Sequence, residues 1–141
     1  MKATVDLFKR REVSLILFIL FFLLIMLCVT PRFLEPGNLV NILLNISTVG
    51  ILSMGQCLVI ITKGIDLSVG ANMGLVTLVV GTMLLSGVGT WTSVLAGVLT
   101  GLACGALNAS LISVLRLPPI IVTLGTLSLF SGLMYMVTNG Q

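Results

Sequence analysis

Long apolar segments alternate along the chain with short polar or proline-containing breaks. The first apolar segment, VSLILFILFFLLIMLCV, runs from Val13 to Val29 and has Ser14 as its only hydroxyl. At about 1.5 Å per residue, a helix of this length approaches the ~30 Å hydrocarbon core of a bilayer. A signal peptide is the alternative, but it would have a shorter apolar region and a small-residue cleavage site. The segment therefore predicts a retained transmembrane helix.

Four further apolar segments predict four more spans. They are Ile46–Thr62, Leu67–Leu85, Trp91–Leu115 and Ile120–Val137, separated from one another and from the first by Pro31–Gly37, Lys63–Asp66, Ser86–Thr90 and Arg116–Pro119. Proline removes a backbone donor and disfavours helix in the preceding residue. The stretch Asn38–Asn45 is either an interfacial helix or the first part of the second span. The apolar runs are continuous rather than alternating, which does not indicate transmembrane strands.

The predicted fold is all-α: a polytopic integral membrane helix bundle of about five transmembrane helices. Residues 1–12 form a basic cytoplasmic segment and residues 13–141 the transmembrane domain. Only 8% of the 141 residues are charged, 57% are hydrophobic and the mean hydropathy is +1.26, whereas soluble domains carry about 25% charged residues. This composition makes the lipid bilayer the surrounding medium. It excludes a soluble globular domain, a disordered tail and a nucleic-acid module.

The basic residues predict the orientation. Seven basic and four acidic side chains give a net charge of +3. With the N-terminus in the cytoplasm, Arg32 alone falls outside, and the other six fall inside: Lys2, Lys9, Arg10, Arg11, Lys63 and Arg116. Because cytoplasmic loops carry the excess of Lys and Arg, we expect the N-terminus inside and Gln141 outside.

Several kinds of chemistry have no residues to support them. The chain has no histidine, which excludes a Ser-His-Asp triad and a histidine-ligated metal within it. The P-loop, GxSxG and HExxH motifs are also absent, so we expect no catalytic residues, no cofactor and no metal. Cys28, Cys57 and Cys104 each lie in an apolar run and are expected to be small buried hydrophobes.

Asp66 lies where the third span begins, followed by Leu67 and Ser68. A carboxylate at a helix start can accept hydrogen bonds from free backbone N–H groups and meets the positive end of the helix dipole. Lys63 is close enough in sequence to pair with it. A structural cap is the expected role; a functional intramembrane acid is the alternative.

Four side-chain amides lie within or near the spans, at Asn45, Gln56, Asn72 and Asn108. Amides at membrane depth must face a partner helix or a wet cavity. They are candidates to line a polar path for a hydroxylated solute, and hydrogen bonding between helices is an equally good explanation.

Glycines recur every four residues in the fourth span, at Gly97, Gly101 and Gly105. Gly70 and Gly74 repeat this spacing at the start of the third. Such a face lets another helix approach closely. Tight static packing is the expected role, and a moving seam is the alternative.

Three stretches resemble one protein family. The first, VIITKGIDLSV at Val59–Val69, is followed by Gly70. The others are PRFL at Pro31–Leu34 with NLVNIL at Asn38–Leu43, and GALN at Gly105–Asn108 with LPPIIVTLGT at Leu117–Thr126. Together they resemble the membrane permeases of bacterial ABC importers for ribose, arabinose, xylose and autoinducer-2. The most specific part is the family signature turn, made of Gly64, Ile65, Asp66, Leu67, Ser68, Val69 and Gly70. Lys63 stands where the family usually has glycine or another small residue.

The resemblance implies a function in sugar import. The chain would form part of the solute path in the bacterial inner membrane, with a separate ABC ATPase subunit, a periplasmic sugar-binding protein and a second permease chain, in a homo- or heterodimer, as partners. Members of the family are about twice as long, so the chain resembles the N-terminal half of a permease domain. A small multispan protein with a structural or channel role independent of an ATPase is the alternative.

Overall fold

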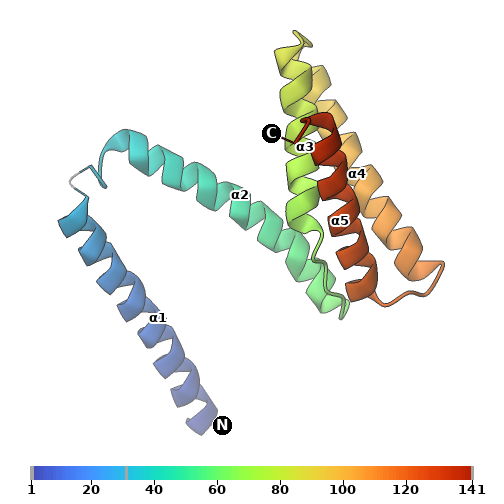
Figure 1. The fold of residues 1–141 in the computed structure, drawn as a ribbon. Helices are drawn as coiled ribbons and strands as arrows, with labels where there is room; N and C mark the ends of the chain where they lie inside the picture. The colour runs from blue at the N-terminus through green and yellow to red at the C-terminus, as the bar shows by residue number, and fades with distance from the viewer. Residues whose placement is uncertain (1, 31, 141) are drawn as a thin grey trace. The chain divides into compact units, whose positions relative to one another are not determined.

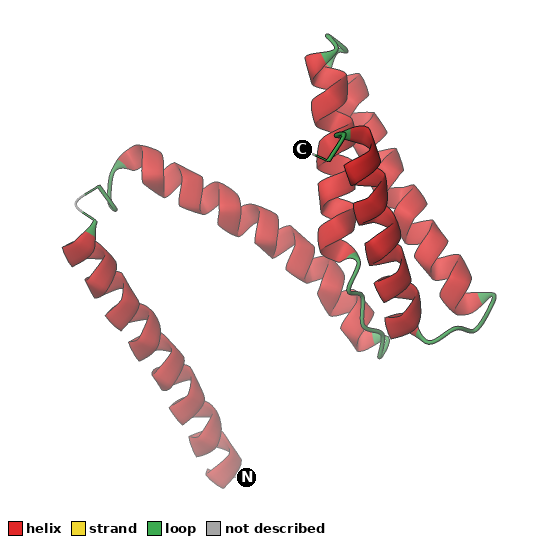
Figure 2. Cartoon of the chain, in the orientation of Figure 1, coloured by secondary structure: helices red, strands yellow, loops and turns green. Residues whose placement is uncertain are grey.

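The computed structural model describes residues 2–30 and 32–140, with side chains from residue 12 onward, and in this part of the chain it is all-helical without strands (Figure 2). The helices are α1 (Lys2–Val29), α2 (Pro36–Ile61), α3 (Val69–Leu85), α4 (Thr90–Ser113) and α5 (Pro119–Val137), labelled in Figure 1. Among the described residues, all but α3 are long and apolar enough to cross a membrane. The predicted fold class is confirmed.

The chain divides into two units, residues 1–50 and 51–141, which are described separately. In the first unit, α1 begins at Lys2, so the polar N-terminal segment is helical and continuous with the first predicted span. The side chains of Lys2, Lys9, Arg10 and Arg11 lie outside the described part, and their cytoplasmic placement stays a prediction. The apolar side chains of α1 from Val13 onward are largely exposed within this chain.

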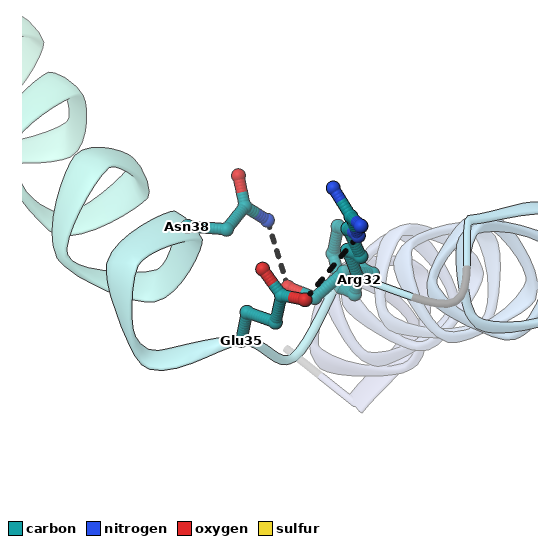
Figure 3. A network of polar contacts seen from close by, with 4 residues as sticks. Arg32, Glu35 and Asn38 are labelled. Atoms are coloured by element: carbon teal, nitrogen blue, oxygen red, sulfur yellow. Dashed lines mark hydrogen bonds and ion pairs between the residues drawn. The ribbon is translucent and has the colours of Figure 1, made fainter.

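The break between α1 and α2 is held by local polar contacts, shown in Figure 3. Arg32 Nε lies 3.5 Å from Glu35 Oε1, and Asn38 Nδ2 donates to the Phe33 carbonyl at 2.7 Å. Helix α2 starts at Pro36, where the missing N–H has no cost because the first helical N–H groups lack partners anyway. Asn38–Asn45 therefore belongs to one continuous helix with the second predicted span.

In the second unit, α3, α4 and α5 lie side by side as a three-helix bundle (Figure 1). Helix α3 contacts α4 and α5 more extensively than these two helices contact each other. The connections 62–68 and 114–118 lie at one end of this bundle. The connection 86–89 and the end of α5 lie at the other. We call the end with connections 62–68 and 114–118 the junction end. Lys63 and Arg116 lie in the junction-end connections, whereas Trp91 and Tyr135, both exposed, lie near the opposite end.

Helices α2 and α3 end in Schellman motifs, in which two backbone N–H groups close the last turn, and α5 ends with one of these two bonds. At the end of α2, Gly64 N donates to Val59 O at 3.0 Å and Lys63 N to Ile60 O at 2.9 Å. Helix α3 ends in the same way with Gly87 in the left-handed position, and at the end of α5 Gly140 N donates to Tyr135 O at 3.0 Å with Asn139 in that position. Lys63 also occupies this position, with φ of 61°, where the absence of a Cβ makes glycine the favoured residue.

The interior of the bundle contains more polar than apolar buried residues. The buried polar residues are Ser68, Ser93, Asn108, Thr123 and Thr126, and the buried hydrophobic residues are Cys104, Val122 and Phe130; Gly97 is buried as well. The hydroxyls of Ser93, Thr123 and Thr126 donate to backbone carbonyls three or four residues earlier, as Ser93 does to Gly89 O at 3.2 Å. Small polar residues of this kind let membrane helices approach closely without leaving donors unpaired.

Two predictions about the spans and cysteines are wrong in detail. The third span was expected from Leu67, but α3 starts at Val69 because Asp66 and Ser68 form a turn instead; at 17 residues it is the shortest of the five helices. Cys104 is buried as expected, whereas Cys28 and Cys57 are exposed. The bundle that buries Cys104 consists of α3, α4 and α5, so cysteines on α1 and α2 have no such interior around them.

Candidate functional site

The centre of the site is the 62–68 connection, which leads from α2 into α3. Asp66 Oδ1 accepts hydrogen bonds from the Ser68 backbone N–H at 2.8 Å and from Ser68 Oγ at 2.7 Å. This side-chain turn explains why the backbone does not continue as helix through Leu67. The ion pair with Lys63 that the sequence allows is not formed: among the described residues the ion pair is that of Arg32 with Glu35.

A hydrogen bond between distant parts of the chain extends this turn to α4. Asn108 Nδ2 donates to Ser68 Oγ at 2.8 Å, across 40 residues of sequence. Because Ser68 Oγ in turn donates to Asp66, the three side chains form a directed series from amide to hydroxyl to carboxylate. Ser68 is fully buried and Asn108 is 6% exposed, so these bonds are formed away from solvent, where an unpaired group is costly.

Two more side chains bind the backbone of the same connection. Gln56 Nε2, from α2, donates to the Asp66 carbonyl at 2.7 Å. Thr123 Oγ1, from α5, lies 3.2 Å from the Ile65 carbonyl and 2.9 Å from that of Pro119. The connection is thus tied to α2, α4 and α5. We call the set Gln56, Asp66, Ser68, Asn108 and Thr123 the polar junction.

A cavity of about 450 Å³ lies at this end of the bundle. It is lined by Val59, Thr62, Gly64, Ile65, Asp66, Gly105, Asn108, Ala109, Ile112, Pro119 and Thr123. Three members of the polar junction, Asp66, Asn108 and Thr123, are therefore also cavity-lining residues. The volume falls within the range of about 300–1,000 Å³ usual for small-molecule sites, and the wall combines many apolar groups with few polar ones, as such sites do.

Comparison with known protein families identifies the family of the chain. The profile of the family described as "Branched-chain amino acid transport system / permease component" matches residues 38–141, which include the whole polar junction and the cavity. The chain belongs to this permease family. With four helices able to cross a bilayer among its described residues, this family member is a multi-pass membrane protein.

Two curated relatives are import permeases. The autoinducer 2 import system permease protein LsrC of Enterobacter sp. (strain 638) is 36% identical over 135 residues, 96% of this chain and 39% of the relative. The ribose import permease protein RbsC of Bacillus subtilis (strain 168) is 38% identical over 123 residues, 86% of this chain and 38% of the relative. The chain thus spans about two fifths of the length of these transport proteins. No solved structure matches it.

The four predicted amides do not come together as one group in this chain. Gln56 and Asn108 belong to the polar junction, and only Asn108 lines the cavity. Asn72, one turn into α3, does not line the cavity, although its Oδ1 is shielded from solvent and has no hydrogen-bond partner among the described residues. Asn45 is exposed on the part of α2 that belongs to the first unit.

Two site residues were not singled out for the site by sequence reasoning. Ser68 was named only as a neighbour of Asp66 and as part of the signature turn, yet it links Asp66 to Asn108. Thr123 was named only within LPPIIVTLGT, yet it binds the Ile65 carbonyl from 58 residues away. Short hydroxyl side chains are common at helix starts, and their sequence carries no signal of a partner so distant.

The glycine face of α4 makes contact with α3 at one end only. A Cβ built on Gly97 would lie 2.5 Å from Val80 Cγ2, and one on Gly101 3.5 Å from Val76 Cγ2. Gly105 has nothing within 4 Å and instead lines the cavity. On α3, Gly74 lies against the Met134 side chain, while Gly70 has open space.

In the described part of the chain, no group of His, Cys, Asp or Glu residues could hold a metal ion.

Proposed function

We propose that this chain is the transmembrane permease component, or part of it, of an ABC-type importer for a sugar or a sugar-derived signal. One observation carries the proposal: the family match covers residues 38–141, and that region contains the polar junction and its cavity. The names of the two relatives, a ribose import permease and an autoinducer 2 import permease, support the solute class.

The role proposed for the site is to form part of the solute path. Asn108 offers a carboxamide to the cavity, and Gln56 fixes the connection that forms one of its walls. Asn72 and Asn45 remain candidates for other sections of the path. The described residues contain no His-based or metal-based catalytic group, and in this proposal ATP hydrolysis is performed by a separate ATPase subunit.

The proposed assembly follows from the same family membership. Its parts are an ABC ATPase subunit, a periplasmic sugar-binding protein and a second permease chain, located in the bacterial inner membrane. The exposed apolar surface of α1, including Leu15, Phe18 and Phe22, is suited to lipid or to further transmembrane helices, because neither requires charged groups.

A chimaeric importer tests the function. The N-terminal part of the Bacillus subtilis ribose permease that aligns with this chain is replaced by the chain, and the product is expressed with that system's ATPase and binding protein. We expect ATP-dependent ribose uptake in cells that lack the native permease. A chimaera that inserts normally and assembles with the ATPase, but does not support uptake of ribose or autoinducer 2, would contradict the proposal.

Liposomes containing the purified 141-residue chain provide the complementary test. An importer component gives no ribose flux when the ATPase is absent, because the solute path must be opened by the ATPase's conformational change. Steady ribose flux in these liposomes, above that of protein-free vesicles, would instead support the independent channel.

A further inference from the structure

We propose that Lys63 and Arg116, at the junction end of the bundle, bind the phosphate groups of anionic phospholipids in the adjacent leaflet of the bilayer. Each of the two cations is exposed, has a positive φ and forms no ion pair in the described part of the chain. This lipid binding does not depend on which solute the proposed permease carries.

The charged residues of the second unit are gathered at one end. Lys63, Asp66 and Arg116 are the charged residues in the sequence from 51 to 141, and all three lie in the junction-end connections (Figure 1). Asp66 is the acidic group there, and its Oδ1 accepts both hydrogen bonds from Ser68. Because two cations face one carboxylate in number, the junction end carries a net positive charge, while the opposite end carries no charged residue.

Both cations occupy the left-handed region of the backbone. Lys63 has φ of 61° and Arg116 has φ of 55°, and in the described part of the chain Asn139 is the third non-glycine residue with positive φ. Asparagine tolerates this region because its short polar side chain can bond locally, whereas lysine and arginine bear the steric cost. Strained positions of this kind cluster at ligand clamps and switch regions. A cation at such a position in each of two separate connections therefore indicates a role for the charge.

Exposed apolar side chains flank each cation. They are 41% to 75% exposed: Ile61 and Ile65 around Lys63, and Leu115 and Leu117 around Arg116. Apolar side chains at a membrane interface can enter the boundary of the acyl chains, while the long stems of Lys and Arg let the charged group reach the headgroups. An acidic protein surface would satisfy the cations and leave the apolar neighbours against charged groups. An anionic lipid surface satisfies both, which is why we assign it as the partner.

Quenching of tryptophan fluorescence by brominated lipids tests the proposal on the 141-residue chain in reconstituted bilayers. The bilayers are equimolar phosphatidylglycerol and phosphatidylcholine, with one of the two lipids brominated at a time. Because Trp91 is the chain's single tryptophan, Ile61→Trp or Leu115→Trp in a Trp91→Phe background places the reporter beside one cation. We expect phosphatidylglycerol to associate about fivefold more strongly than phosphatidylcholine at both positions, the value of one cation near an anionic surface.

Glutamine variants remove each charge and keep the Cβ. Lys63→Gln should abolish the preference for phosphatidylglycerol at position 61, and Arg116→Gln should abolish it at position 115. Lys63→Arg keeps the charge and should keep the preference. Raising the salt concentration should weaken the preference in both reporter chains, since salt screens exposed charges. The salt titration uses no charge variant, so it decides even where a glutamine variant does not fold.

Arg32 and the native Trp91 supply matched controls. Arg32 is also exposed, but it pairs with Glu35 at 3.5 Å. Arg32→Gln therefore removes the same net charge from the chain and should leave the preference at positions 61 and 115 unchanged. In the chain that retains Trp91, the two brominated lipids should quench its fluorescence equally, because that end of the second unit has no charged residue.

The outcomes separate this inference from the proposed function. Equal quenching by the two lipids at positions 61 and 115 would overturn it, and is the result expected if the cations bind an acidic protein instead. A preference that persists in both glutamine variants, or that is equally large at Trp91, would also overturn it. A preference lost in Lys63→Gln and Arg116→Gln but kept in Arg32→Gln would support it, whether or not the chimaera transports ribose.

Discussion

At the scale of single residues, Lys63 is the clearest position to alter. It occupies the left-handed position of the α2 Schellman motif, with φ of 61°. This conformation brings the Cβ of an L-residue close to the following carbonyl, at a cost of about 1 kcal/mol. We therefore predict that Lys63→Gly raises the free energy of unfolding by about 1 kcal/mol, measured by reversible denaturation in mixed micelles.

The charge of Lys63 must be separated from its backbone conformation. Lys63→Gln removes the charge and keeps the Cβ, so it should change stability little, since no ion pair joins Lys63 to Asp66 in the described part of the chain. Lys63→Val should destabilise, because a β-branched residue tolerates positive φ least. Equal stability of the Gly and Val variants would show that the left-handed conformation is not populated in the membrane protein.

At the scale of the helices, the glycine face of α4 predicts a graded response to alanine. At Gly97 the added Cβ would meet Val80 Cγ2 at 2.5 Å, and the stiff, β-branched valine cannot easily move away. We predict that Gly97→Ala destabilises by about 1–3 kcal/mol, as overpacking usually does. Thermal or denaturant unfolding of the α3–α4–α5 bundle, followed by circular dichroism, measures it.

Gly101→Ala and Gly105→Ala are the controls on the same face. The new Cβ at Gly101 would lie at 3.5 Å, ordinary van der Waals contact, and that at Gly105 would meet nothing within 4 Å. Both variants should be neutral or more stable by up to about 1 kcal/mol, because alanine favours helix over glycine. A Gly97 variant as stable as the Gly105 variant would disprove the close approach of α3 and α4.

The sequence predicts the helices well and their contacts poorly. Continuous apolar runs and proline or glycine breaks place α4 and α5 within two residues of the observed bounds. They also allow, as one of two alternatives, the continuous helix through Asn38–Asn45. The start of α3 at Val69 rather than Leu67 was missed because the Asp66–Ser68 turn competes locally with helix.

The contacts within the candidate site could be predicted from the sequence even less well than those between the helices. Asn72 and Asn108 are both amides in apolar helices, and the sequence gives no reason to separate them. Only the tertiary arrangement brings Asn108 to Ser68 and to the cavity. The contact of Thr123 with Ile65 spans 58 residues, and hydrophobic periodicity carries no information about such pairs.

At the scale of the whole molecule, the distribution of charge and aromatic residues along the bundle bears on its orientation. The junction end carries Lys63 and Arg116, and the opposite end carries the exposed Trp91 and Tyr135. Lys and Arg favour the cytoplasmic side, while Trp and Tyr settle at either membrane interface. We therefore predict that the two connections 62–68 and 114–118 lie together on the cytoplasmic side, which requires 86–89 to be external.

Single-cysteine labelling in intact cells tests this orientation, in a background where Cys28, Cys57 and Cys104 are replaced. Thr62→Cys and Leu115→Cys stand beside the basic residues without removing them, and Ser86→Cys marks the opposite end. Leu34→Cys marks the first predicted external break. We predict that a membrane-impermeant maleimide labels positions 34 and 86 from outside, whereas positions 62 and 115 react only after permeabilisation.

External labelling at 62 and 115 would reverse the assigned orientation, because moving the basic connections outside opposes the charge bias that sets it. Opposite results for positions 62 and 115 would contradict the bundle itself, since Thr123 binds Ile65 and Asn108 binds Ser68 only if both connections lie at one end.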